Sequence, residues 1–333
     1  GPRTGGGYQA RANHAMGGRA MVGGVARRER RRAPLMALFE SMLVLLLLVE
    51  VIGKVSGGSQ RWLNLGFMTL QPSELMKPII VVVLSRFYSD LPPSMTTTWR
   101  GLLPAVGLLA LPAGLVILQP DLGTGLAISF GAFIVIFLAG LPARWFIAGG
   151  VAGLIAAPLA FFFALHDYQR QRVFVFMDPS KDPLGTGYHI LQSTIAIGSG
   201  GITGKGFLNG SQSHLDYLPE AHTDFAFATM AEEWGLMGGF FVLLMFGILL
   251  RWGMNTSRRA PDRFSQLLAA GMTCTMFFYA AINLMMVMGL APVVGIPLPF
   301  ISHGGSSMMT NMICIGTIMA VERWTQTGRR PLS

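Results

Sequence analysis

Long apolar stretches with few charged residues constrain this chain more than any other feature of its sequence. Only 12% of its 333 residues are charged, whereas soluble proteins carry roughly 25%. A helix needs about 20 apolar residues to cross a bilayer. We therefore predict an all-α polytopic integral membrane protein with about eight transmembrane helices, near residues 35–52, 73–89, 101–118, 125–141, 145–165, 226–250, 266–290 and 306–321.

The distribution of basic residues predicts the topology. If the first span leaves the cytoplasm, 18 of the 25 Lys and Arg fall in the inside segments, which are residues 1–34, 86–100, 142–144, 251–265 and 322–333. This asymmetry follows the positive-inside rule and puts both termini in the cytoplasm. The net charge of +9 then reflects membrane orientation, and we expect no nucleic-acid partner.

The chain has a segment at each end that is expected to lie outside the membrane domain. Residues 1–33 contain eight Arg and lack the apolar core of a signal peptide, so we predict a disordered basic segment. Its Arg cluster would orient the first helix or touch anionic membrane lipids. The membrane domain would span residues 34–322, and residues 323–333 would form a cytoplasmic tail.

The longest polar connection, residues 166–225, is expected on the outer face and is too long for a structureless loop. Apolar residues at helical spacing predict a short interfacial or re-entrant helix over 186–197. This helix, which carries Gln192, would either contact the substrate or cap the bundle as an ordinary loop helix. The glycine-rich run 198–206 lacks the Walker A spacing. Lys205 within this run is interpreted as a phosphate ligand or as a solvated lysine.

Three ionisable side chains gather at the edge of an apolar span: Glu220, His222 and Asp224. Such groups are costly to place beside hydrocarbon, so they are candidates for a functional site. Asp224 would lie near the N-terminus of the span that begins around residue 226, where the helix dipole favours an ionised carboxylate. It could act as a general base or simply cap that helix. Glu220 and His222 are alternative bases.

Other polar residues have both functional and structural interpretations. Glu74 and Lys77 stand three residues apart on a predicted helix, at the spacing where opposite charges meet. We interpret them either as a buried structural ion pair or as cavity residues that bind phosphate. Arg61, beside Trp62, would hold phosphate or sugar, or anchor the chain at the interface. Asp121 follows Gln-Pro and is interpreted as a turn residue.

Three polar residues nearer the C-terminus are expected to be structural or to line a cavity. Glu232 and Glu233 lie about two helical turns beyond Asp224, and acids at that depth should face the bundle interior. Ser302 belongs to a polar segment expected to end a re-entrant turn and cap the last span, with substrate contact as the alternative.

Six segments together resemble the successive motifs of the SEDS family (shape, elongation, division, sporulation). They occur in family order within residues 34–322: GSQRWL (58–63), QPSELMK (71–77), QPDLGT (119–124), the run 198–206, HTDF (222–225) and PLPFIS (297–302). The resemblance implies a bacterial inner-membrane glycosyltransferase that polymerises lipid II and works with a class B penicillin-binding protein. It also implies that Asp224 is the catalytic residue and that the Glu74–Lys77 pair lines a central cavity.

The chemistry of such a reaction can be argued from residue types. A sugar hydroxyl attacks an anomeric carbon while lipid pyrophosphate leaves, so one carboxylate base suffices. A cationic side chain or a divalent cation, Mg²⁺ or Mn²⁺, would stabilise charge on the phosphate. The α linkage of the family's donor and the β linkage of its product imply a single inverting displacement. Two other functions fit the same sequence: a lipid II transporter, and a non-catalytic scaffold for the penicillin-binding protein.

The chain departs from the family pattern at two places. The family has ten spans, and the shortfall lies before residue 34, so we expect that the first two helices are missing through a truncated or frame-shifted start. His303 stands where the family usually has Tyr before a pair of glycines.

Overall fold

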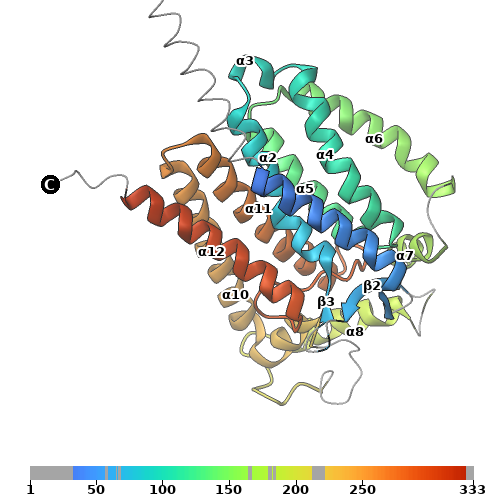
Figure 1. The fold of residues 1–333 in the computed structure, drawn as a ribbon. Helices are drawn as coiled ribbons and strands as arrows, with labels where there is room; N and C mark the ends of the chain where they lie inside the picture. Colours follow the sequence, from blue (N-terminus) through green and yellow to red (C-terminus); the bar gives the residue numbers. More distant parts are fainter. Residues whose placement is uncertain are drawn as a thin grey trace, which may run out of the picture.

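The protein is a bundle of long helices with one small sheet (Figure 1). The computed structural model describes residues 33–56, 59–64, 66, 69–163, 167–178, 182, 185–211 and 222–327. The expected disorder of residues 1–33 falls almost entirely outside these ranges. The described helices are Ala33–Ile52, α2 (Pro72–Asp90), α3 (Pro93–Thr96), α4 (Trp99–Leu118), α5 (Leu122–Leu138), α6 (Ala143–Phe163), α7 (Asp167–Met177), α8 (Thr186–Ser199), α10 (Ala226–Arg259), α11 (Arg263–Val287) and α12 (Gly305–Thr327).

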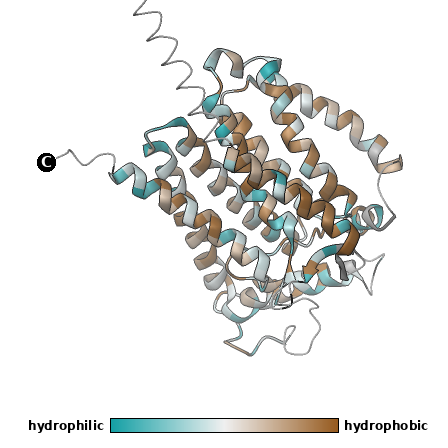
Figure 2. Cartoon of the chain, in the orientation of Figure 1, coloured by the Kyte–Doolittle hydropathy of each residue, from teal (hydrophilic) through white to brown (hydrophobic). Residues whose placement is uncertain are grey.

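The helical fold class is confirmed, and each of the eight predicted spans coincides with a helix. Within the described ranges, four helices are long and apolar enough to cross a membrane: Ala33–Ile52, α4, α10 and α11. Shorter apolar helices follow at α5 and within α6. In Figure 2 the middle of the long helices is coloured mainly as hydrophobic. The protein is therefore a multi-pass membrane protein.

A three-stranded antiparallel sheet connects the first helix to α2, and the sequence did not predict it. Its strands β1 (Lys54–Ser56), β2 (Ser59–Asn64) and β3 (Thr69–Leu70) pair in the order β1-β2-β3. The strands are short and pair locally, so their alternation is too brief to stand out from a loop.

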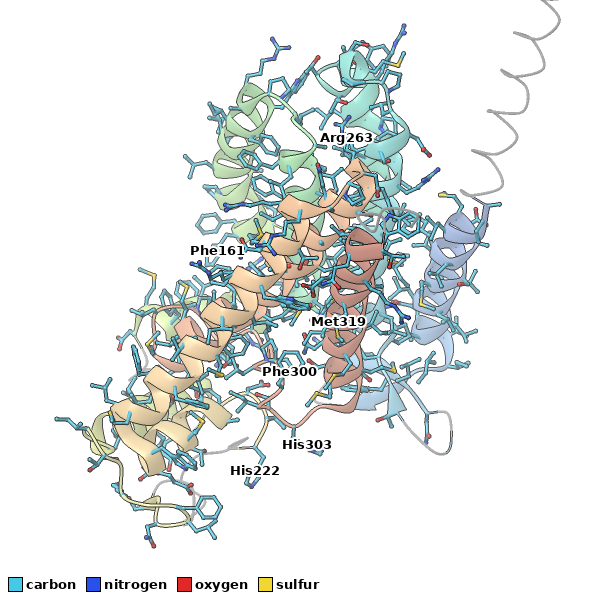
Figure 3. All side chains as sticks on the ribbon, turned by 90° about the vertical axis from the view of Figure 1, so that its left-hand side faces the viewer. Phe161, His222, Arg263, Phe300, His303 and Met319 are labelled. Carbon is cyan, nitrogen blue, oxygen red and sulfur yellow. The ribbon has the colours of Figure 1, made fainter. Side chains whose placement is uncertain are left out.

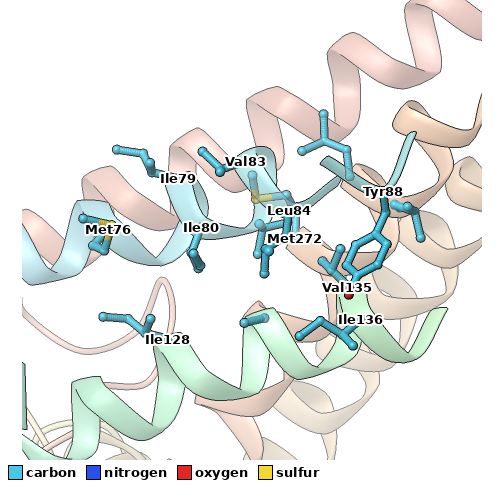
Figure 4. Packing of buried hydrophobic residues seen from close by; sticks show 14 of the residues in the cluster. Met76, Ile79, Ile80, Val83, Leu84, Tyr88, Ile128, Val135, Ile136 and Met272 are labelled. Atoms are coloured by element: carbon cyan, nitrogen blue, oxygen red, sulfur yellow. The ribbon is translucent and has the colours of Figure 1, made fainter. Parts of the chain in front are cut away.

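The core forms where α11 packs against α2, α5, α10 and α12. Figure 4 shows side chains of α2 facing those of α5, with Met272 of α11 between them. Met76, Ile80, Leu84 and Met272 are fully buried. In contrast, α4, α6 and the part of α10 from Trp234 to Ile248 expose large apolar side chains, as helices in contact with lipid do.

The basic segments expected in the cytoplasm meet at one end of the bundle. Arg263 at the start of α11 donates a 2.7 Å hydrogen bond to the Ala139 carbonyl after α5. Tyr88 near the end of α2 donates a 3.1 Å bond to the Gly101 carbonyl of α4. In Figure 3, Arg263 lies at this end and His222 lies at the other. The bundle therefore separates a basic end from the end that carries the candidate site.

Candidate active site

Asp224 lies in a turn that leads directly into α10. Residues 222–225 form this turn, and Phe225 is the N-cap of α10. Asp224 therefore stands one residue before the cap position. Its position close to the positive end of the helix still favours the ionised carboxylate. The side chain is partly exposed, which is suitable for a group that must meet a substrate.

Two hydrogen bonds from distant parts of the chain fix this turn. Asn283, fully buried on α11, donates through Nδ2 to the Asp224 carbonyl at 2.9 Å. The same nitrogen donates to the Ile296 carbonyl at 2.7 Å. The His303 N–H donates to the His222 carbonyl at 2.8 Å, and Figure 3 shows the two histidines at the same end of the bundle. The backbone around Asp224 is thereby tied to the segment between α11 and α12.

That segment passes close to the carboxylate at Gly295. Gly295 has a φ of +69°, and a Cβ placed there would lie 3.5 Å from Asp224 Oδ2. A left-handed backbone conformation favours glycine. Arg172 of α7 donates a 2.9 Å hydrogen bond to the Val293 carbonyl, so the connection between α6 and α10 also holds this segment. The carboxylate is thus enclosed on one side by backbone.

The predicted short helix of the outer loop is present as α8 and packs beside the turn. His189 stacks on Phe225, with ring centroids 5.9 Å apart and an interplanar angle of 13°. Ser193 is fully buried and donates to the Val287 carbonyl at 2.7 Å. Gln192 Oε1 is buried and accepts no hydrogen bond from the described residues. Gln192 remains a predicted substrate contact.

The helix α10 is broken at Gly235, nine residues after its first residue, Ala226. Gly235 has φ +64° and ψ −159°, which no α-helix contains. In a continuous helix the Leu236 N–H would donate to the Glu232 carbonyl. Instead the Leu236 N–H donates to the Gly201 carbonyl at 2.9 Å, and the Glu232 carbonyl accepts from the Lys205 N–H at 3.0 Å. The glycine-rich loop therefore replaces the missing helical hydrogen bonds.

The same exchange is repeated one residue further along α10. The Gly206 N–H donates to the Glu233 carbonyl at 3.0 Å, and the Met237 N–H donates to the Ile202 carbonyl at 3.2 Å. Gly204, with φ +79°, lies so close that a Cβ would overlap the Glu233 carbonyl. The backbone of a membrane helix must have its hydrogen bonds satisfied within the protein. The loop meets this requirement and fixes the first part of α10, which follows Asp224.

Lys205 serves the same junction through its side chain. Its Nζ lies 2.6 Å from Glu232 Oε1 and donates to Ser211 Oγ at 2.8 Å. Glu232 is fully buried, and Ser211 donates to it at 3.1 Å. The lysine is therefore neither free in solvent nor presented to a phosphate by these contacts. Its binding of phosphate stays a prediction.

The Glu74–Lys77 pair lies within the core of the bundle. Lys77 Nζ is 2.5 Å from Glu74 Oε1, and both side chains are buried. The ammonium also lies 4.1 Å from the centre of the Tyr279 ring. Pro72 occupies the first turn of α2, as predicted for a helix start. The geometry is that of a buried ion pair with an additional cation–π contact.

Arg61 and Asp121 meet at the turn between α4 and α5. The Arg61 guanidinium donates to the carbonyls of Gln119 and Pro120, and its Nη1 lies 3.9 Å from Asp121 Oδ1. Asp121 caps α5 by accepting from the Thr124 N–H at 3.1 Å. These contacts give Asp121 its expected turn role and make Arg61 an anchor of the same turn.

The remaining predicted residues occupy separate places. Ser302 closes a turn by accepting from the Leu298 N–H at 2.9 Å. Glu233 is 9% exposed and lines a groove on the outside of α10. Glu220 lies outside the described residues. Among the described residues no three His, Cys, Asp or Glu side chains gather as a metal site, so a role for Mg²⁺ or Mn²⁺ stays a prediction.

Comparison with known proteins decides the family. A profile of the cell cycle protein family FtsW/RodA/SpoVE matches residues 22–327. The chain belongs to the FtsW/RodA/SpoVE family, which is the SEDS family. Peptidoglycan glycosyltransferase MrdB of Escherichia coli strain K12 is 43% identical over 300 residues, which are 89% of this chain and 78% of that protein. Stage V sporulation protein E of Bacillus subtilis is 36% identical over 85% of this chain and 77% of its own length.

Solved structures of SEDS relatives have the same fold. One chain in a structure described as a peptidoglycan synthase complex that coordinates polymerization and crosslinking superposes on this chain with a TM-score of 0.75. The two chains are 35% identical, and the match covers 90% of this chain and 83% of the other. The rod shape determining protein RodA of Thermus thermophilus gives a TM-score of 0.63 at 30% identity, covering 89% and 80%.

Sequence reasoning missed two residues that shape the site in this SEDS protein. Asn283 lies within an apolar span, and an amide at such depth is the signal that it has polar partners. Gly235 lies within the sequence of a predicted span, where a single glycine is tolerated and gives no clear sign of a break.

Proposed function

We propose that this chain, a peptidoglycan glycosyltransferase, polymerises lipid II into glycan strands with Asp224 as its general base. The observation that carries the assignment is the double attachment of the Asp224 turn, through Asn283 and His303, at the end of the bundle opposite the basic segments. A base must be held within hydrogen-bond reach of the proton it removes. The buried amide and the backbone bond give this turn the required rigidity.

The reaction then proceeds as one displacement. The hydroxyl oxygen of the acceptor sugar forms a bond to the anomeric carbon of the donor, and the bond from that carbon to the lipid pyrophosphate breaks. The hydroxyl proton passes to the Asp224 carboxylate, and the pyrophosphate leaves with the bonding electrons. Pyrophosphate is a good leaving group, so no second carboxylic acid is needed to protonate it. The configuration changes from α to β.

The setting of the reaction is part of the proposal. The basic end of the bundle would face the cytoplasm with both termini, and Asp224 would lie at the outer face of the bacterial inner membrane. A class B penicillin-binding protein would crosslink the product. A relative solved as part of a peptidoglycan synthase complex supports an assembly of this kind.

One observation favours a second candidate. The Glu74–Lys77 pair is buried at membrane depth, where charged groups mark substrate pathways as well as structural contacts. A lipid II transporter would use such a pair for the pyrophosphate headgroup. A non-catalytic scaffold remains the third alternative.

Reconstitution with labelled lipid II and the partner protein tests these functions. Asp224→Asn should reduce polymer formation by about 100-fold or more, because it removes the base. Asp262→Asn is the matched control: Asp262 caps α11 at the opposite end, and Asn caps helices about as well. Headgroup translocation without polymer, equal in the native chain and Asp224→Asn, would establish the transporter instead. If neither polymer formation nor translocation is detected in any of the chains, the result would support the scaffold function.

A further inference from the structure

A groove runs along the outside of α10 from the turn that carries Asp224. It consists of two adjoining hollows of about 460 Å³ and 510 Å³. The two share Phe207, Glu233, Trp234 and Phe241, and the first also reaches His222. We call this feature the α10 groove. Because His222 belongs to the same turn as Asp224, the groove reaches the turn that carries the candidate base.

The carboxylate of Glu233 is the chemically unusual group in the α10 groove. Glu233 is 9% exposed, and within the described part of the chain no hydrogen bond or ion pair engages its side chain. Its neighbour Glu232 is buried too, but Lys205 and Ser211 satisfy it. Burying a carboxylate without partners is costly. The chain satisfies one of two adjacent acids and leaves the other facing the groove, where a ligand can supply the donors.

The charge of the groove limits which ligand fits. Its described lining contains the Glu233 carboxylate, the His222 imidazole at the end beside the Asp224 turn, and no Lys or Arg; Lys205 nearby is already paired with Glu232. A pyrophosphate would be repelled by the carboxylate. A neutral chain rich in hydroxyl groups would donate to it, and charge-assisted hydrogen bonds of this kind are the strong ones.

The walls of the groove suit the same ligand. Phe207, Trp234 and Phe241 present flat aromatic faces, and each is more than half exposed. Aromatic faces pack against the C–H faces of sugar rings as they do against other apolar surfaces. The groove thus combines an acceptor for hydroxyl groups with flat apolar walls.

The position of Glu233 places this ligand near the reacting bond but not at it. Glu233 lies seven residues into α10, which is about 10 Å along the helix from its start. A group at that distance contacts sugar units beyond the one that reacts. Glu233 would therefore act in binding the strand and not in proton transfer.

We propose that the α10 groove is a subsite for the glycan strand, in which sugar hydroxyls donate to Glu233 and sugar rings pack on Trp234. This inference rests on the proposed polymerase function. It separates the sugar part of the substrate, held along α10, from the pyrophosphate, which the groove excludes by charge. Loss of this subsite should weaken the hold on the strand, so that polymers end early.

The first test measures binding to the full-length chain by calorimetry. The probes are a lipid-free tetrasaccharide of the glycan repeat, and undecaprenyl phosphate as the competing lipid ligand. The tetrasaccharide should bind the native chain, and Glu233→Leu should bind it roughly tenfold or more weakly, the equivalent of one lost hydrogen bond. Glu233→Gln keeps one acceptor oxygen and should lie between the two. Binding of undecaprenyl phosphate alone, or equal tetrasaccharide binding by all three chains, would overturn the proposal.

The second test measures polymer length with matched aromatic substitutions. Trp234→Leu should shorten the strands, whereas Phe240→Leu, on the same helix and outside the groove lining, should leave their length unchanged. Equal lengths in both variants would contradict the proposal. Failure of the proposed polymerase function can be distinguished from failure of the groove proposal. In the first case the native chain makes no polymer, whereas the tetrasaccharide binding test does not depend on polymer formation. Thermal unfolding of each variant in detergent verifies that it is folded.

Discussion

The side-chain amide of Asn283 donates a 2.9 Å hydrogen bond to the main-chain carbonyl of Asp224. The two residues are far apart in the sequence, on α11 and on the turn before α10. The same amide nitrogen also holds the Ile296 carbonyl, so one buried side chain joins two irregular segments. Irregular backbone at the edge of a membrane needs such partners, because bulk water does not reach every carbonyl.

Asn283→Ala should therefore impair catalysis by loosening the Asp224 turn. It leaves two carbonyls without their donor, and each buried unsatisfied group costs about 1–3 kcal/mol. We expect polymer formation to fall by roughly tenfold or more, with a lower unfolding temperature. Asn255→Ala, at the other end of α10, is the control. Unchanged polymer formation by a folded Asn283→Ala chain would show that the amide does not position the base.

The helices of this protein could be predicted from the sequence because their signal is local. About 20 apolar residues in a row indicate a span whatever the span packs against. The start of α2 could also be predicted, since Pro72 and Glu74 both suit a first helical turn. The position of Asp224 before a helix followed from the onset of the apolar run.

The contacts between distant segments could not be predicted in the same way. The run Gly198–Gly206 suggested a phosphate-binding loop, because glycines allow a backbone to approach a ligand closely. In the structure they allow the approach of α10 instead, at its break. A loop that binds phosphate and a loop that packs against a helix have the same glycine-rich composition. The two can be distinguished only in the structure, where the loop lies opposite the helix break at Gly235.

Gly204→Ala should damage the protein through this close approach. Its Cβ would overlap the Glu233 carbonyl, and the φ of +79° is unfavourable for alanine. Gly198→Ala is the matched control in the same run, because no atom lies within 4 Å of the added Cβ and the residue is helical. Alanine there should be neutral or stabilise α8 by up to about 1 kcal/mol. Equal unfolding temperatures for the two variants would contradict the close packing of loop and helix.

Substitution of the Lys205–Glu232 pair should distinguish a structural lysine from a phosphate ligand. Lys205→Met leaves the fully buried Glu232 carboxylate without its cation and should be destabilising, but by less than the roughly 3–5 kcal/mol of a fully buried pair, because the lysine side chain is 30% exposed to solvent. Adding Glu232→Gln should restore most of that stability, because no uncompensated charge remains. Polymer formation should recover along with stability in the double variant. A stable double variant that remains inactive would instead support the phosphate role of Lys205.

The same design applied to Glu74 and Lys77 should separate the two interpretations that the sequence left open. Lys77→Met alone should be strongly destabilising, by roughly 3–5 kcal/mol, because Glu74 would remain buried and charged. Lys77→Met with Glu74→Gln removes both charges and should regain much of the stability. If the pair binds the lipid pyrophosphate, the double variant will unfold near the native temperature yet show a raised KM for lipid II, since the cation that met the phosphate is gone. If the pair is only structural, KM and stability will recover together.

The Tyr279 ring lies against the Lys77 ammonium and provides an internal comparison. Tyr279→Leu removes the cation–π contact but keeps both charges. We therefore expect it to lower the unfolding temperature and to leave the KM for lipid II unchanged.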